Sequence, residues 1–136
     1  MIKKHLLDTP AVTSLVSTRV YIDEQPDPAT LPSITIHPTS GVPDKTVAGA
    51  TFTRTQVSCW SLPGKPKNPK PVETVAAAVR AVFHKPRFNS LPYKLTAGTT
   101  TYKVITSQVT GGVRLIDPTT GWYHIPLDIE ILYNEV

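Results

Sequence analysis

The sequence predicts an α+β domain in which helices cover one face of a mainly antiparallel sheet. Residues 72–83 place apolar side chains three and four positions apart, as along one side of a helix. Residues 122–133 alternate apolar and polar side chains, as in a strand with one face on a core. The helical and strand patterns follow the order helix, strands, helix, strands. We therefore expect one domain spanning residues 1–136.

The amino-terminal part predicts helix first and strands after it. Residues 2–16 are expected to be helical in two pieces, because Thr9 and Pro10 suit an N-cap and a first helical position. Apolar and β-branched runs then predict strands at residues 19–22, 33–37 and 51–60. A polar, glycine-containing loop is expected at residues 39–50.

A proline-rich stretch at residues 61–71 predicts a stiff, exposed loop before the second half of the chain. The helix that follows should bury Val72, Val75, Ala76, Val79, Val82 and Phe83. Strands are expected at residues 102–109 and 122–133, and residues 113–116 either resume the first of these or pair elsewhere.

A turn is predicted between the last two strands. Asp117, Pro118 and Gly121 have the residue types that open, shape and close such a turn. Pro126 lies inside the final strand and has no amide donor, so we expect an unpaired side or a bulge there. The polar face of this strand is accordingly interpreted as that of an edge-like strand.

Composition indicates a folded chain and gives little indication of its partners. Apolar residues make up 40% of the 136 residues and charged residues 18%, which is typical of a globular protein. The net charge of +4 fits ordinary surface solvation, or a nucleic acid or acidic protein partner. Residues 1–7 do not resemble a signal peptide, and no apolar stretch is long enough for a membrane helix. We expect a protein that stays in the cytoplasm, away from membranes, until it joins a larger assembly.

No group of residues predicts catalysis, a cofactor or a metal site. The histidines are scattered at positions 5, 37, 84 and 124, whereas a metal needs several converging ligands. Cys59 is the only cysteine and shares a strand face with Val57, which favours a buried apolar role over a nucleophile. Asp128 and Glu130 share one strand face, where solvation or pairing with cations is favoured over acid–base chemistry. The sequence therefore predicts a protein that is not an enzyme.

Several phrases of the sequence, in this order, resemble the tail-completion and tail-terminator proteins of long-tailed bacteriophages. The matching phrases include an opening at residues 15–21, Leu31-Pro32, a central strand at 54–60, an alanine-rich helix at 75–82, and Asp117-Pro118-Thr119-Thr120-Gly121-Trp122-Tyr123 running into the last strand. The loop at residues 61–71 departs from the family pattern, since it is richer in proline and more basic.

The resemblance implies a structural virion protein. Such proteins form a ring, usually of six subunits, on the head-proximal end of the finished tail tube. The ring ends tube growth and presents the head–tail joining surface, while DNA passes through its hole without sequence-specific binding. Its implied partners are further copies of itself, the tail tube protein and the head connector or stopper protein. Two alternatives stay open: a head–tail connector or stopper protein, and a small nucleic-acid-binding module with aromatics and cations clustered on one sheet face.

A ring requires two different patches that meet between neighbours, and exposed segments are suited to this role. The expected interface segments are the final strand and the loops at residues 40–50 and 61–71. Within them the candidate interface residues are Val42, Val47, Leu62, Lys65, Lys67, Lys70, Asp128 and Glu130. The three lysines form the one local basic cluster, which either stays solvated or contacts a DNA backbone or an acidic protein surface.

Overall fold

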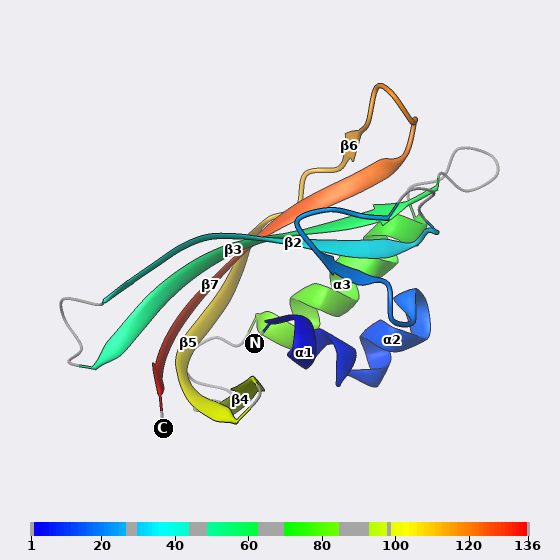
Figure 1. Cartoon of the computed structure of the whole chain (residues 1–136). Coiled ribbons are helices and arrows are strands. Elements are labelled where there is room, and N and C mark those ends of the chain that lie inside the picture. Colours follow the sequence, from blue (N-terminus) through cyan, green and yellow to red (C-terminus); the bar gives the residue numbers. More distant parts are fainter. Residues whose placement is uncertain are drawn as a thin grey trace.

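A long, curved sheet forms the body of the molecule, and three helices pack against one of its faces (Figure 1). The computed structural model describes residues 2–26, 30–43, 49–62, 70–84, 93–97 and 99–135. Its helices are α1 (Ile2–Leu7), α2 (Pro10–Val16) and α3 (Lys70–Phe83). Its strands are β1 (Val20–Ile22), β2 (Ser33–Pro43), β3 (Ala50–Ser61), β4 (Tyr93–Ala97), β5 (Thr100–Gly111), β6 (Leu115–Ile116) and β7 (Tyr123–Glu135).

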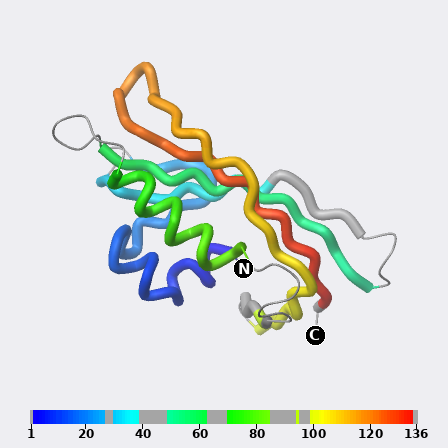
Figure 2. The backbone as a smooth tube through the Cα atoms, turned by 180° about the vertical axis from the view of Figure 1, so that it is seen from behind, coloured from blue at the N-terminus to red at the C-terminus, as the bar shows by residue number. Residues whose placement is uncertain are grey.

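The sheet is mainly antiparallel, as predicted. The strand order is β1-β2-β3-β7-β5-β4, and β6 pairs with β7 beyond the end of β5. Only the β1–β2 pair is parallel among the described strands. With the helices on one face, this arrangement confirms the α+β prediction (Figure 2).

The helices and the sheet share one apolar core. All six residues that the pattern of α3 assigned to its inner side are buried. They pack with alternate residues of the strands, among them Val57, Cys59, Leu127 and Ile129, whose side chains are wholly buried. The two-piece amino-terminal helix is confirmed. The Thr9 hydroxyl, however, donates to the carbonyl of His5 at 2.7 Å and does not cap α2. Within the described residues, no helix is long and apolar enough to cross a membrane.

The predicted loop at residues 39–50 was wrong over its first part. Strand β2 continues to Pro43 and pairs with β3 through the register Val42 to Phe52. Proline is tolerated here because Pro38 adjoins a shift in register, where the regular pairing is interrupted. Strand β4, which pairs with β5, was not predicted at all.

The interpretation of the final strand as edge-like was also wrong. Strand β7 is central, with β3 on one side and β5 and β6 on the other. The predicted unpaired side at Pro126 is confirmed. The Pro126 carbonyl faces Gly111, where the β5 ladder ends, and pairing on that side resumes only at His124. A residue's amide and carbonyl point to the same side of a strand, so the proline nitrogen faces this gap.

Candidate interaction surfaces

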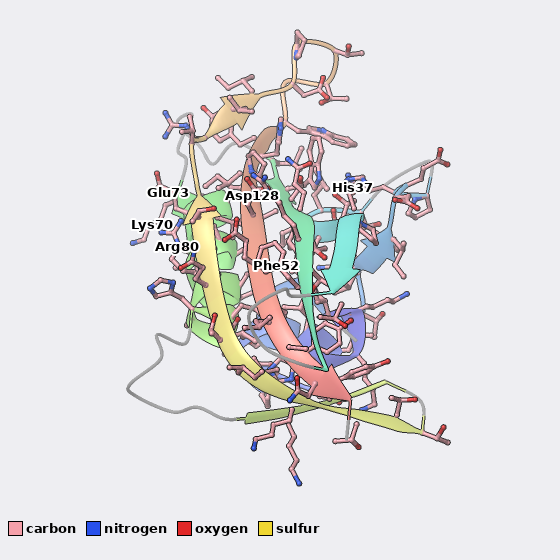
Figure 3. All side chains as sticks on the ribbon, turned by 90° about the vertical axis from the view of Figure 1, so that its left-hand side faces the viewer. His37, Phe52, Lys70, Glu73, Arg80 and Asp128 are labelled. Atoms are coloured by element: carbon pink, nitrogen blue, oxygen red, sulfur yellow. The ribbon has the colours of Figure 1, made fainter. Side chains whose placement is uncertain are left out.

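The helix-free face of the sheet carries polar side chains at its centre. Asp128, labelled on β7 in Figure 3, has its carboxylate 3.3 Å from the guanidinium of Arg54 on β3. The Gln108 amide on β5 donates to Glu130 at 3.0 Å. Both predicted carboxylates therefore already have partners within the chain, from the strands on either side of β7. Contacts of this kind in water contribute little to stability, and they leave the centre of this face polar.

An aromatic cluster occupies the same face near the start of β7. The rings of Trp60 and His124 stack at 4.3 Å, and Trp122 meets Trp60 edge-on at 6.5 Å. The Trp60 indole nitrogen donates to the Thr35 hydroxyl at 3.0 Å. Burial lowers the pKa of His124, although nearby Asp117 acts in the opposite direction. The His124 ring is therefore held neutral at ordinary pH. Its Nδ1 is buried and has no hydrogen-bond partner among the described residues.

Sequence reasoning missed this cluster. Trp60 and His124 are directly opposite each other in the β3–β7 register, yet 64 positions separate them in the chain. The sequence did contain one signal for the cluster. Each of the two predicted strands has an aromatic ring, Trp60 or His124, at a position on its polar face.

A hairpin of residues 112–122, here called the arm, extends beyond the end of β5 (Figure 1). It contains β6 and the predicted turn, which is confirmed. The Asp117 carboxylate accepts amide hydrogen bonds from Thr119 at 2.8 Å and Thr120 at 3.2 Å. These backbone bonds lower the pKa of Asp117. The arm leaves three apolar side chains largely in solvent: Val113 (71% exposed), Leu115 (43%) and Ile116 (59%).

Helix α3 holds the root of the arm through two charged side chains (Figure 3). Arg80 donates to the Gly111 carbonyl at 3.3 Å. Glu73 lies 3.6 Å from Arg114, whose guanidinium also stands 5.5 Å from the Tyr123 ring centre. The arm therefore has a defined orientation relative to the helical layer.

An apolar groove opens on the helix-covered face of the sheet, beside the first residues of α1. Its volume is about 220 Å³. Strand side chains from β1, β2 and β3 form its floor, and the start of α1 forms one wall. Its lining residues are Ile2, Lys3, Ile22, Ile36, Pro38, Thr53 and Thr55.

The structure describes part of the predicted interface. Leu62 is 56% exposed just after β3, and Lys70 is exposed at the first position of α3. Asp128 and Glu130 lie on the helix-free face, and Val42 is paired through its backbone with Phe52. Val47, Lys65 and Lys67 lie outside the described residues. Among the described candidates, Lys70 belongs to the helical layer whereas Asp128 and Glu130 lie on the helix-free face, and the interface they were assigned to stays a prediction.

The expectations about Cys59 and about metal ligands can be compared with the described part of the chain. Cys59 is wholly buried, and burial raises the pKa of its thiol to about 12, which confirms the buried role. Over the described ranges, no three side chains of the metal-binding types come together.

Three comparisons with known proteins bear on the chain. The family model described as "Tail completion protein gp17" matches residues 1–134. A chain in a solved structure described as the virion of a native gene transfer agent (GTA) particle is similar, with a TM-score of 0.69 and 15% identity. The alignment covers 99% of this chain and 92% of that chain, and at this identity it shows the fold alone. No curated protein sequence matches.

Proposed function

The chain belongs to the Tail completion protein gp17 family, and from this premise we propose that it caps the head-proximal end of a phage tail tube as a ring. The ring ends tube growth and forms the surface to which the head is joined. The family match over residues 1–134 is the observation that carries this proposal. The role is structural and not enzymatic, and the site of action is the virion tail, assembled in the host cytoplasm.

A ring of six copies is the proposed form, with duplex DNA passing through its hole. Rings require heterologous contacts, in which one patch of a subunit meets a different patch of the next. The arm, with its exposed apolar side chains, is one candidate patch, and the sequence candidates Val47, Lys65 and Lys67 are further ones. The tail tube protein and a head connector or stopper protein are the proposed partners on the two faces of the ring.

The decisive experiment is an infection with a phage genome in which this gene is inactivated. We expect tail tubes of uncontrolled length that do not join filled heads, as measured by electron microscopy of the lysate. Supplying the intact gene in the same host should restore tails of normal length that join filled heads. Tails of normal length, joined to heads in normal numbers, would contradict the proposal.

A connector or stopper protein gives a different result in the same experiment. It acts after the tube has been terminated, so its loss leaves tail length normal and only joining or DNA retention fails. The length distribution therefore separates the two structural roles.

A nucleic-acid-binding module has weaker support. The Trp60, Trp122 and His124 cluster supplies the aromatic part of the feature that would favour it. The Trp60 ring, however, is already stacked by His124, and the charged group that acts on His124 is the carboxylate of Asp117. Carboxylates repel phosphates, so this face does not favour a nucleic acid backbone.

A further inference from the structure

Both tryptophans of the chain lie in one cluster on the helix-free face of the sheet. Trp60 and Trp122 meet at 82° with their ring centres 6.5 Å apart, and neither residue is fully buried. Tryptophan is enriched at sites where proteins bind partners, because its large ring gains most from leaving water. The two nearly perpendicular indoles therefore present an apolar corner at the surface.

Two polar groups border this corner. The Trp60 indole nitrogen already donates to Thr35, whereas the Trp122 indole nitrogen has no hydrogen-bond partner among the described residues. Asp117 is joined to Trp122 by a backbone hydrogen bond of 2.9 Å, and its carboxylate forms no ion pair within the described part of the chain. The corner thus offers indole rings, one N–H donor and one negative charge.

The chain itself contains a segment with the matching chemistry. Residues 63–69 read Pro-Gly-Lys-Pro-Lys-Asn-Pro, with proline at every third position. A polyproline II helix has three residues per turn, so Pro63, Pro66 and Pro69 share one side of it. The carbonyl groups of such a helix form no hydrogen bonds within it and are free to accept them from a partner. Aromatic-lined sites recognise segments of this kind through their proline rings.

The ends of this segment are at the surface, and its charge is opposite to that of the corner. Residues 63–69 lie outside the described ranges, but Leu62 before them is 56% exposed, and Lys70 after them is exposed at the start of α3 (Figure 3). Lysines at positions 65 and 67 make the segment basic, which suits the carboxylate of Asp117.

The corner of one copy is poorly placed for that copy's own segment. Two residues separate Trp60 from Pro63, so the segment would have to fold back over the strand that it has just left. Its other end, Lys70, begins α3, which packs on the opposite face of the sheet (Figure 2). A polyproline helix from Pro63 to Pro69 is straight and about 19 Å long, so it does not fold back between these ends. The occupant therefore comes from another molecule.

We propose that residues 63–69 of one copy bind the Trp60–Trp122 corner of a second copy. The prolines pack against the two indoles, the Trp122 N–H donates to a carbonyl of the segment, and a lysine pairs with Asp117. The contact joins two different patches, so it repeats head to tail from copy to copy, as a closed ring requires. This inference deepens the proposed function and rests on it for the ring that the repeated contact builds.

A synthetic peptide of residues 61–71, added to the dilute full chain, tests the contact without requiring assembly. Because both tryptophans lie in the cluster, the intrinsic fluorescence of the chain reports binding directly. We expect a saturable change in emission, and roughly tenfold weaker binding by a control peptide with alanine in place of Pro63, Pro66 and Pro69. The control peptide keeps every charge. Equal binding of the two peptides, or binding by neither, would overturn the inference.

Substitutions in the full chain test each part of the corner. Trp122→Phe keeps an aromatic ring and removes the N–H donor, so the peptide should bind several-fold more weakly. Asp117→Asn keeps an acceptor for the turn and removes the charge, so binding should weaken and lose most of its dependence on salt. Asp8→Asn, which removes an exposed carboxylate from the helical layer, is the matched control. Native binding by both corner variants would overturn the inference.

Mixing two variants tests whether the contact joins separate copies. A chain with Trp122→Ala keeps the segment, and a chain with alanine at Pro63, Pro66 and Pro69 keeps the corner. Above the dissociation constant of the peptide, the mixture should give a heterodimer and nothing larger in sedimentation, while neither variant should pair by itself. A mixture that does not pair, or bound-state emission from the native chain at every dilution, would overturn the contact between copies.

The outcome is separable from that of the proposed function. If loss of the gene gives tails of uncontrolled length while the peptide does not bind, this contact is wrong and tail capping stands. If the peptide binds and the mixed variants pair while tails reach normal length without this chain, the contact stands and tail capping falls.

Discussion

The Arg80 guanidinium occupies the space in which a side chain on Gly112 would begin. A Cβ added at Gly112 would clash with Arg80 Nη2, and it would also approach the Leu127 side chain at 3.6 Å. Gly112 has a φ of +112°, a conformation that residues with side chains rarely adopt. Arg80 in turn donates to the Gly111 carbonyl. The absence of a side chain at Gly112 is what brings the root of the arm against α3.

Gly112→Ala should therefore lower the free energy of unfolding by about 2–3 kcal/mol, from backbone strain and from displacement of Arg80. In an Arg80→Met background the steric part disappears, so the same substitution should cost about 1 kcal/mol less. A double-mutant cycle measured by urea unfolding tests this coupling. Gly49→Ala is the matched control, since Gly49 also has a positive φ but open space around it. Additive losses in the cycle would contradict the assigned contact.

Ser107 stabilises the end of α3 from the neighbouring strand. Its buried hydroxyl donates to the Phe83 carbonyl, which has no partner within the helix. Ser107→Ala should cost about 1–3 kcal/mol in the free energy of unfolding, because a buried acceptor loses its donor. Ser14→Ala, at an exposed helical position, should change the same quantity by less than about 0.5 kcal/mol. Equal effects at both positions would show that the Phe83 carbonyl finds another donor.

The parts of the fold that the sequence predicted are those with a strong local period. The six buried positions of α3 repeat every three or four residues, and β7 alternates along its whole length. Either pattern is visible within a dozen residues. The Asp117 turn was predictable for the same reason, because its hydrogen bonds join residues two to five positions apart.

The errors concern pairings between distant segments. Alternation along β7 indicates which face is buried, but it says nothing about which strands lie beside it, and β3 is some seventy residues away. The continuation of β2 to Pro43 was missed because its prolines and glycine predict a loop, whereas pairing with β3 overrides that local preference. The partners of Asp128 and Glu130 come from β3 and β5, so their place in the sheet could not be predicted from the strand alone.

Charge reversal on the helix-free face tests the predicted role of Asp128 and Glu130 in an interface. Asp128→Lys should lower stability by no more than about 1 kcal/mol, because its pair with Arg54 is partly exposed and screened by water. If the face meets a partner, virion yield in a complementation assay should nevertheless fall at least tenfold. Glu130→Lys should behave alike, and Glu24→Lys, exposed outside this face, serves as the control. Normal yields from both variants would show that this face remains in solvent.

The buried thiol of Cys59 makes stability depend on pH at the alkaline end. Burial raises its pKa from 9.0 to about 12, so the folded state keeps the thiol neutral, whereas the unfolded chain ionises above pH 9. The unfolded state then binds fewer protons than the folded state, and stability falls as pH rises through this window. The contribution is fully present below pH 9 and is lost progressively between about pH 9 and 12. One pKa unit corresponds to about 1.4 kcal/mol, so the loss between pH 9 and 11 should be about 2–3 kcal/mol.

Cys59→Ala isolates this contribution. At pH 7 the variant should be less stable than the native chain by about 1–2 kcal/mol, because a small cavity replaces the sulfur atom. Above pH 9 its free energy of unfolding should fall less steeply than that of the native chain, so the two curves converge and then cross. Urea unfolding at steps of half a pH unit from 7 to 11 measures both curves. Parallel curves would mean that the thiol titrates alike in both states, which would require water to reach Cys59 in the folded protein.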